Sequence, residues 1–307
     1  MNRIDVKLKY KKHIWTKYSN GSFSYNSYQV NYIFTNLSNR EICMDITILT
    51  DSVNSGICPV FVEIIDFMYL ACGTMPIIIY YKDNNKDIAL EQISCRFFPA
   101  MKYFKNENLI DISNQTLNES TLTNIQNIVR NKPFEIFSAF TALTSSAYEE
   151  IYIEHRIALL LHCFEGYIYN KDSYYQKNGI TFKDRINEIL KVLFDYDKKY
   201  NTEILKTLNF SEDGFLQTLT DTRHQFSHYI IKNSPLTEDN YLVTFFLLHY
   251  IFRLYVIKEI NLVPNEKNIE EFLKSIYDWL NVLNNSGFKN FKSITYAFNY
   301  AMQQLKP

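Results

Sequence analysis

Apolar and polar residues alternate along the first half of the chain, which is the pattern of half-buried β-strands. In IDVKLKYKK, Val6, Leu8 and Tyr10 fall on one face of a strand and three lysines fall on the other. The runs SYQVNYIF and EICMDITILT are rich in β-branched and aromatic residues and are separated by turn-forming residues. These segments predict an antiparallel sheet or sandwich.

One segment of this half has helical spacing instead. The stretch VFVEIIDFMYLACG, residues 60–73, places Glu63 and Asp66 one turn apart on its polar side and ends at Gly73, which suits a left-handed C-terminal stop. The run IIIYY follows it. We expect a helix that leads into a buried strand, and a further short strand at FFPAMKYF, residues 97–104.

From about Pro133 the pattern becomes helical. The segment EEIYIEHRIALLLHCFEGYIY, residues 149–169, carries its apolar residues on one stripe. Thr181, with Asp184 three positions later, predicts the start of a second helix. Asp213 is placed to begin a third.

Two more helices complete this half. Thr237 is a candidate cap for the long apolar segment 238–260, and NIEEFLKSIYDWLNVL, residues 268–283, is amphipathic. Five helices with short connections predict an up-and-down bundle. The fold class is therefore α+β, with a β-rich domain at 1–132 that contains one helix and an all-α domain at 133–307.

Charge and composition narrow the function classes. The net charge of the 307 residues is −1, so no overall basic field favours binding to duplex nucleic acid. The five cysteines are scattered and form no C-x2-C pair, which fits a reducing cytoplasm. No signal peptide is recognisable, and the most apolar run, 241–257, is short for a bilayer and contains His249 and Arg253.

Several enzyme motifs are missing from the sequence. None of the seven glycines forms G-x-G, so neither a dinucleotide fingerprint nor a phosphate loop is present. No G-x-S-x-G elbow occurs. Cys163 follows His162, but adjacent residues on a helix point in different directions, and we interpret Cys163 as a core residue.

The segment DTRHQFSH, residues 221–228, holds the main candidate chemistry. His224 and His228 have the spacing of two zinc ligands on one helical face. Gln225, however, stands where H-E-x-x-H would have its general base, and no third ligand is obvious nearby. A metal hydrolase therefore ranks last among the functions considered.

The same segment contains Arg223 and His228 as an Arg-x4-His pair. An arginine can neutralise a phosphate and a histidine can transfer protons near neutral pH, which are the parts of metal-free RNA cleavage. Five residues on an ideal helix turn through about 140° and rise about 7.5 Å, so one helix does not readily close such a site. A two-fold dimer would close the site, because two such helices face to face would supply an arginine and a histidine from either chain. The alternative is a surface ion pair for Arg223 and a core position for His228.

The order of motifs resembles the HEPN superfamily, and most closely its ApeA-like anti-phage defence proteins. The shared order is RIALLLHCFEGYI, TFKDRI, TRHQFSH and LYVIKEINL, preceded by DFMYLACGTMPIIIYY, which is similar to the ApeA-type N-terminal domain. The resemblance implies a ribonuclease in which Arg223 and His228 are catalytic. His224 and Glu165 would be supporting groups, although Glu165 could equally pair with Arg185.

The resemblance also implies a biological setting. We expect a cytoplasmic homodimer, joined through the helical domain, that cleaves single-stranded or loop RNA in abortive infection. It would need no metal or other cofactor and no membrane. The N-terminal half, whose only histidine is His13, would sense a phage-derived trigger or restrain the helical half. The competing hypothesis is a catalytically silent HEPN module that binds protein or nucleotide.

Overall fold

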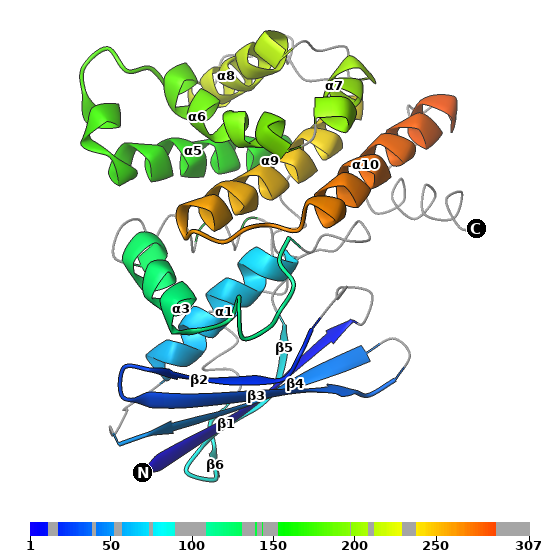
Figure 1. Ribbon diagram of the computed structural model, residues 1–307. Helices are drawn as coiled ribbons and strands as arrows, with labels where there is room; N and C mark the ends of the chain where they lie inside the picture. Colours follow the sequence, from blue (N-terminus) through cyan, green and yellow to red (C-terminus); the bar gives the residue numbers. More distant parts are fainter. Residues whose placement is uncertain are drawn as a thin grey trace.

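The computed structural model shows a β-sheet at one end of the molecule and a group of helices at the other, with further helical segments between them (Figure 1). The α+β class predicted from the sequence is confirmed. The structure describes residues 1–11, 18–38, 41–51, 57–73, 76–89, 109–130, 139, 143, 153–196, 198–207, 212–228 and 238–286.

The sheet contains six strands in the order β2-β3-β4-β1-β5-β6, and all neighbouring strands are antiparallel. Within the described residues it is a single sheet and not two packed sheets. The expected strand at 97–104 lies outside the described residues. The strands are β1 (Asn2–Lys11), β2 (Gly21–Tyr25), β3 (Tyr28–Asn36), β4 (Glu41–Thr50), β5 (Ile77–Asp83) and β6 (Lys86–Asp87).

The two faces of the sheet differ as the alternation predicts. Val6, Leu8 and Tyr10 are buried on the face that the helices cover. On the other face, Lys7 pairs with Asp45 across the sheet at 3.3 Å. The expectation of a buried strand at IIIYY is wrong in part, because the side chains of β5 alternate between the faces and its first and third isoleucines, 77 and 79, are exposed.

Helix α1, Pro59–Cys72, lies across the covered face of the sheet (Figure 1). Its predicted end is confirmed: Gly73 has φ 71°, and its N–H donates to Tyr69 O at 2.8 Å. Glu63 and Asp66, however, are buried and not on a solvated face. The reason is that α1 packs against the sheet on one side and against α3, Glu119–Ile125, and α9 on others. Helix α3 is a second helix of the N-terminal half.

Among the described residues of the helical half there is one more α-helix than predicted. The addition is α7, a short helix directly after α6. Asp213 proves to lie inside α8, which begins one residue earlier, while Thr237 lies outside the described residues. The helices are α5 (Ile153–Lys171), α6 (Phe182–Tyr196), α7 (Lys198–Thr207), α8 (Glu212–His228), α9 (Glu238–Glu259) and α10 (Glu266–Ser286).

Helix α9 is the centre of the molecule. Every residue from 243 to 257 is buried, because α1 packs on one side of α9 and α5 and α6 pack on the other. Phe252 stacks on Phe164 of α5, with ring centroids 5.1 Å apart. The hydrophobic core is thus continuous from the sheet through α1 and α9 into the bundle. Among the described helices, none is long and apolar enough to cross a membrane.

Candidate active site

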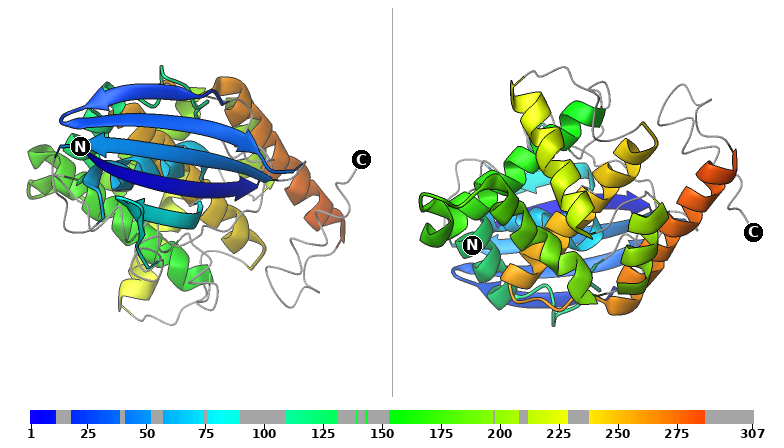
Figure 2. Two further views of the ribbon diagram at one scale, coloured as in Figure 1. Left: turned by 90° about the horizontal axis from the view of Figure 1, so that it is seen from below. Right: turned by 90° about the horizontal axis from the view of Figure 1, so that it is seen from above.

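The candidate site lies where α5, α6 and α8 meet, on the side of the bundle away from the sheet (Figures 1 and 2). The apolar stripe of α5 faces α9, where Phe164 is fully buried. The residues of α5 on its other side therefore turn toward α6 and α8. Two of them, His162 and Glu165, are one helical turn apart.

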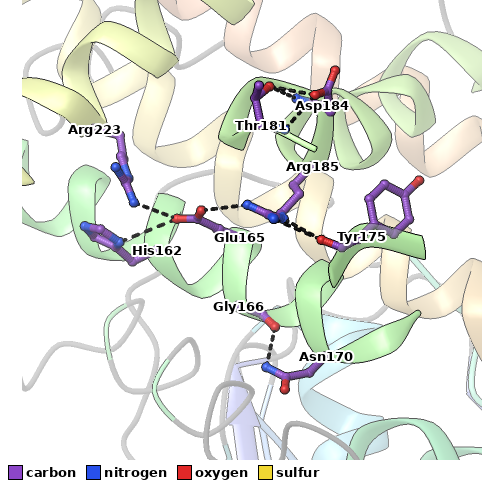
Figure 3. Close-up of polar contacts among 9 residues, drawn as sticks. All are labelled: His162, Glu165, Gly166, Asn170, Tyr175, Thr181, Asp184, Arg185 and Arg223. Atoms are coloured by element: carbon purple, nitrogen blue, oxygen red, sulfur yellow. Dashed lines mark hydrogen bonds and ion pairs between the residues drawn. The ribbon is translucent and has the colours of Figure 1, made fainter. Parts of the chain in front are cut away.

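Glu165 is bound by two arginines from two different helices (Figure 3). Arg185 Nη1 of α6 lies 3.1 Å from Glu165 Oε1, and Arg223 Nη2 of α8 lies 3.0 Å from Oε2. Each carboxylate oxygen thus accepts one charge-assisted hydrogen bond. One negative and two positive charges leave the cluster with a net positive charge when His162 is neutral.

Arg185 is positioned by the start of α6. Thr181 and Asp184 form a capping box: Asp184 Oδ2 accepts from Thr181 N at 2.7 Å, and Thr181 Oγ1 accepts from Asp184 N at 3.3 Å. The next residue, Arg185, also donates through Nε and Nη2 to Tyr175 O at 3.1 and 2.9 Å. These contacts occupy most of its donors, so Arg185 is mainly a structural cation.

Arg223 is held less completely. Its guanidinium contacts Glu165 through Nη2 and lies over the Phe182 ring, 5.1 Å from the centroid. Its Nε is buried and has no hydrogen-bond partner among the described residues. One quarter of the side chain is exposed. The guanidinium is therefore held by Glu165 and Phe182, and its exposed part can meet another anion, such as a phosphate group.

His162 belongs to the same cluster, and it was not among the predicted site residues. Its Nδ1 lies 3.9 Å from Glu165 Oε2, the oxygen that Arg223 also contacts. Burial and the positive charge of Arg223 lower the pKa of His162, and Glu165 opposes this shift. The imidazole is therefore neutral at physiological pH. The i,i+3 spacing to Glu165 was the signal in the sequence that could have revealed it.

The other predicted residues have different outcomes. Glu165 and Arg223 come together, and the alternative pairing of Glu165 with Arg185 is present at the same time. His224 is exposed on α8, beside Arg223 in sequence. His228 is the last residue of α8, and its side chain lies outside the description. Its catalytic role therefore stays a prediction.

Two further predictions concern cysteine and metal chemistry. Burial raises the pKa of Cys163 to about 12, so its thiol is a poor nucleophile, in keeping with a core position. Among the residues that the structure describes, no three histidine, cysteine, aspartate or glutamate side chains gather to hold a metal ion. The pairing of His224 with His228 depends on the side chain that is not described.

Comparison with known proteins gives one match. Residues 164–264 match the family described as Apea-like HEPN. The matched segment begins next to Glu165 and includes α6, α7, α8 and α9, so it contains both arginines of the cluster. No curated protein and no solved structure matches the chain.

Proposed function

Because residues 164–264 match the Apea-like HEPN family, we propose that the chain is a metal-independent endoribonuclease of anti-phage defence. HEPN domains are in general nucleases. The observation that carries the proposal is the state of Arg223, whose guanidinium is oriented by Glu165 and Phe182 while one quarter of its side chain is exposed. A phosphodiester is an anion that such a group recognises.

The proposed reaction uses the 2′-hydroxyl of the RNA as nucleophile. A histidine accepts its proton, the 2′-oxygen attacks the adjacent phosphorus, and the bond to the 5′-oxygen breaks as that oxygen takes up a proton. Arg223 stabilises the negative charge that builds up on the phosphate oxygens, and His228 carries protons. The products are a 2′,3′-cyclic phosphate and a 5′-hydroxyl. His224 is proposed as a supporting polar group on the exposed side of α8.

Glu165 is proposed to position Arg223. A carboxylate that accepted hydrogen bonds only from Arg223 would neutralise the charge of its guanidinium and weaken the binding of phosphate. In this protein the same carboxylate also accepts from Arg185, so its charge is shared between two guanidinium groups. Arg223 is therefore oriented without being fully neutralised.

We also propose that the active unit is a two-fold dimer. His228 follows Arg223 by five residues on α8, which corresponds to about 140° and 7.5 Å on an ideal helix. Two α8 helices placed side by side would bring the arginine of one chain close to the histidine of the other. Sedimentation tests this: a monomer at micromolar concentration that still cuts RNA would contradict the dimer and not the chemistry.

The sheet-containing half is proposed to restrain the helical half until a phage-derived trigger binds, within the cytoplasm. The support is the contact between α1 and α9, which joins this half to the helix on which α5 and α6 pack. Deleting the N-terminal half would uncover buried residues of α9. Substitutions at this contact are therefore the better test: Tyr69→Phe should raise cellular toxicity at an unchanged protein level, and unchanged toxicity would argue against restraint.

A silent binding module is the second candidate, and one observation favours it. Arg223 already has an ion-pair partner, Glu165, and an arginine in that position can be purely structural. Such a protein would fold and bind partners but would have no cleavage to lose.

The deciding experiment uses the purified full chain and mixed-sequence single-stranded RNA in the presence of EDTA. The wild-type protein should cut slowly because it is restrained, Tyr69→Phe should cut faster, and the new ends should carry a 2′,3′-cyclic phosphate or its hydrolysis product. Arg223→Ala should reduce the rate by roughly 10²–10³, as loss of a preorganised donor does, and His228→Ala should also abolish cutting. Cutting that requires added metal, or full activity of both variants, would overturn the proposal. Absence of any cutting, by the wild type and by Tyr69→Phe alike, would favour the binding module.

A further inference from the structure

The geometry around Glu165 points to His162 as a second proton-transfer residue of the same site, one that receives the proton of the RNA 2′-hydroxyl. This inference rests on the proposed function and assigns a residue that the Arg-x4-His pair does not include. The reaction needs two proton transfers at different oxygens, the 2′-oxygen and the departing 5′-oxygen. Each α8 supplies one histidine of the Arg-x4-His pair, and in the proposed dimer the site pairs this histidine with the arginine of the other chain. A second proton-transfer group beside that arginine would complete the set.

The position of His162 fits this role. Glu165 Oε2 lies 3.0 Å from Arg223 Nη2 and 3.9 Å from His162 Nδ1, so the guanidinium and the imidazole lie within about 7 Å of each other. In a near-attack geometry the 2′-oxygen lies about 3–3.5 Å from the phosphorus. One nucleotide can therefore place its phosphate on Arg223 and its 2′-hydroxyl on His162.

The orientation and exposure of the ring are also suitable. Nδ1 is the ring nitrogen that faces Glu165, and the other nitrogen points away from it (Figure 3). A carboxylate beside Nδ1 favours the tautomer with the proton on Nδ1, which leaves Nε2 to accept a proton. The side chain is 41% exposed, so a polymer substrate can reach it.

The charges around the imidazole ring of His162 determine whether it accepts the proton of the 2′-hydroxyl or donates a proton to the 5′-oxygen. Among the residues that the structure describes, Glu165 on the same helix and Arg223 on α8 are charged groups that act on His162, and Arg185 of α6 holds the other oxygen of Glu165. Arg223 and burial keep the imidazole neutral, and a neutral imidazole is a base. His162 Nε2 then takes the 2′-hydroxyl proton, His228 gives a proton to the 5′-oxygen, and the two rings return to their initial states by proton exchange with water.

The test compares His162→Gln, His162→Asn and the control His155→Gln, which changes an exposed histidine two turns earlier on α5. On RNA whose cut site has been mapped, both His162 variants should cleave roughly 10²–10⁴ times more slowly. The control should cleave at the wild-type rate. All three should melt at the wild-type temperature. The rise of kcat/KM with pH on the acidic side should disappear in the His162 variants alone.

A substrate with sulfur in place of the 5′-oxygen at the mapped bond separates base from acid. A thiolate leaves without a proton, so this substrate should restore the rate of His228→Gln and leave His162→Gln slow. Rescue of His162→Gln would make His162 the acid and overturn the assignment. So would a His162→Gln protein that cleaves within threefold of wild type with an unchanged pH profile. If neither the wild type nor Tyr69→Phe cuts RNA, the proposed function itself has failed, and this inference falls with it.

Discussion

Tyr69 Oη lies 2.9 Å from His249 Nε2, and this buried hydrogen bond joins α1 to α9. One turn further along α9, Arg253 donates to the carbonyl oxygens of Leu70 and Ala71 at the end of α1, at distances of 2.9–3.1 Å. These carbonyls belong to the last turn of α1, where the helix itself leaves acceptors without partners. The sheet-bearing half and the helical half are thus connected by buried hydrogen bonds between polar groups.

The buried imidazole makes stability depend on pH. Burial, together with the charges of Arg253 and Arg156, places the pKa of His249 well below its usual range. Its stabilising contribution is complete above the unfolded-state pKa, near 6.5, and is lost as the pH falls from there toward the folded-state pKa. We expect the free energy of unfolding to fall by up to about 1.4 kcal/mol per pH unit below pH 6.5. Urea denaturation between pH 7.5 and 5 measures this.

The control for this prediction is a residue that cannot titrate. His249→Gln can keep a hydrogen bond to Tyr69, and its stability should change less with pH than that of the wild type. The exposed His155, changed to Gln, should leave the wild-type slope intact. Identical slopes for wild type and His249→Gln would show that other groups cause the loss.

Gly73 is expected to tolerate no side chain. Its φ is 71°, which costs an L-residue about 1–2 kcal/mol, and a Cβ at this position would collide with the guanidinium of Arg253. Gly73→Ala should therefore lower the free energy of unfolding by more than Gly179→Ala. Gly179 also has positive φ, at 94°, but a Cβ there would meet no atom within 4 Å. Equal losses would mean that Arg253 moves aside freely.

Replacing Glu165 should destabilise the bundle as well as impair the site. Glu165→Gln leaves two partly buried guanidinium groups without their carboxylate. The side chains of these ion pairs are 12–25% exposed. The loss in the free energy of unfolding should therefore lie between the losses typical of surface and of buried ion pairs, at about 1–3 kcal/mol. Glu203→Gln, which breaks an exposed pair with Lys206, should cost little. Chemical denaturation of both variants at pH 7.5 compares them directly, and equal losses would contradict a structural role for Glu165.

The capping box of α6 should affect both stability and cleavage. Thr181→Ala removes a hydroxyl that accepts from Asp184 N and donates to its carboxylate, and such caps contribute about 1 kcal/mol. Fraying of the first turn would also loosen Arg185 and Phe182, which contact Glu165 and Arg223. Thr181→Ser, which keeps the hydroxyl, should behave as wild type. A normal cleavage rate in Thr181→Ala would show that the site does not depend on this turn.

Features with a local cause were predictable from the sequence. The stop at Gly73 and the start of α6 at Thr181 each follow from a few neighbouring residues whose hydrogen bonds lie within one turn. The alternation of Val6, Leu8 and Tyr10 likewise defined the buried face of β1. The order of the strands and the burial of Glu63 could not be predicted in this way, because each depends on which distant segment packs against it.

The residues of the candidate site also differ in whether a local sequence pattern could predict them. Arg223 and Glu165 were predicted through a resemblance, but their contact joins residues 58 positions apart, and no local pattern encodes it. In the sequence His162 stands out only as the neighbour of Cys163. Its proximity to Arg223 depends on how α5 packs against α8, which only the tertiary structure shows.

The central position of α9 also affects how the protein is made. The chain leaves the ribosome with the sheet and α1 first, then α5, α6 and α8, and α9 almost last. The apolar surfaces of α1 and α5 that pack on α9 stay uncovered until about residue 257 has emerged. The helices that carry Glu165 and Arg223 are therefore synthesised before the helix that supports α5, and a nascent chain cannot assemble the site before translation is nearly complete.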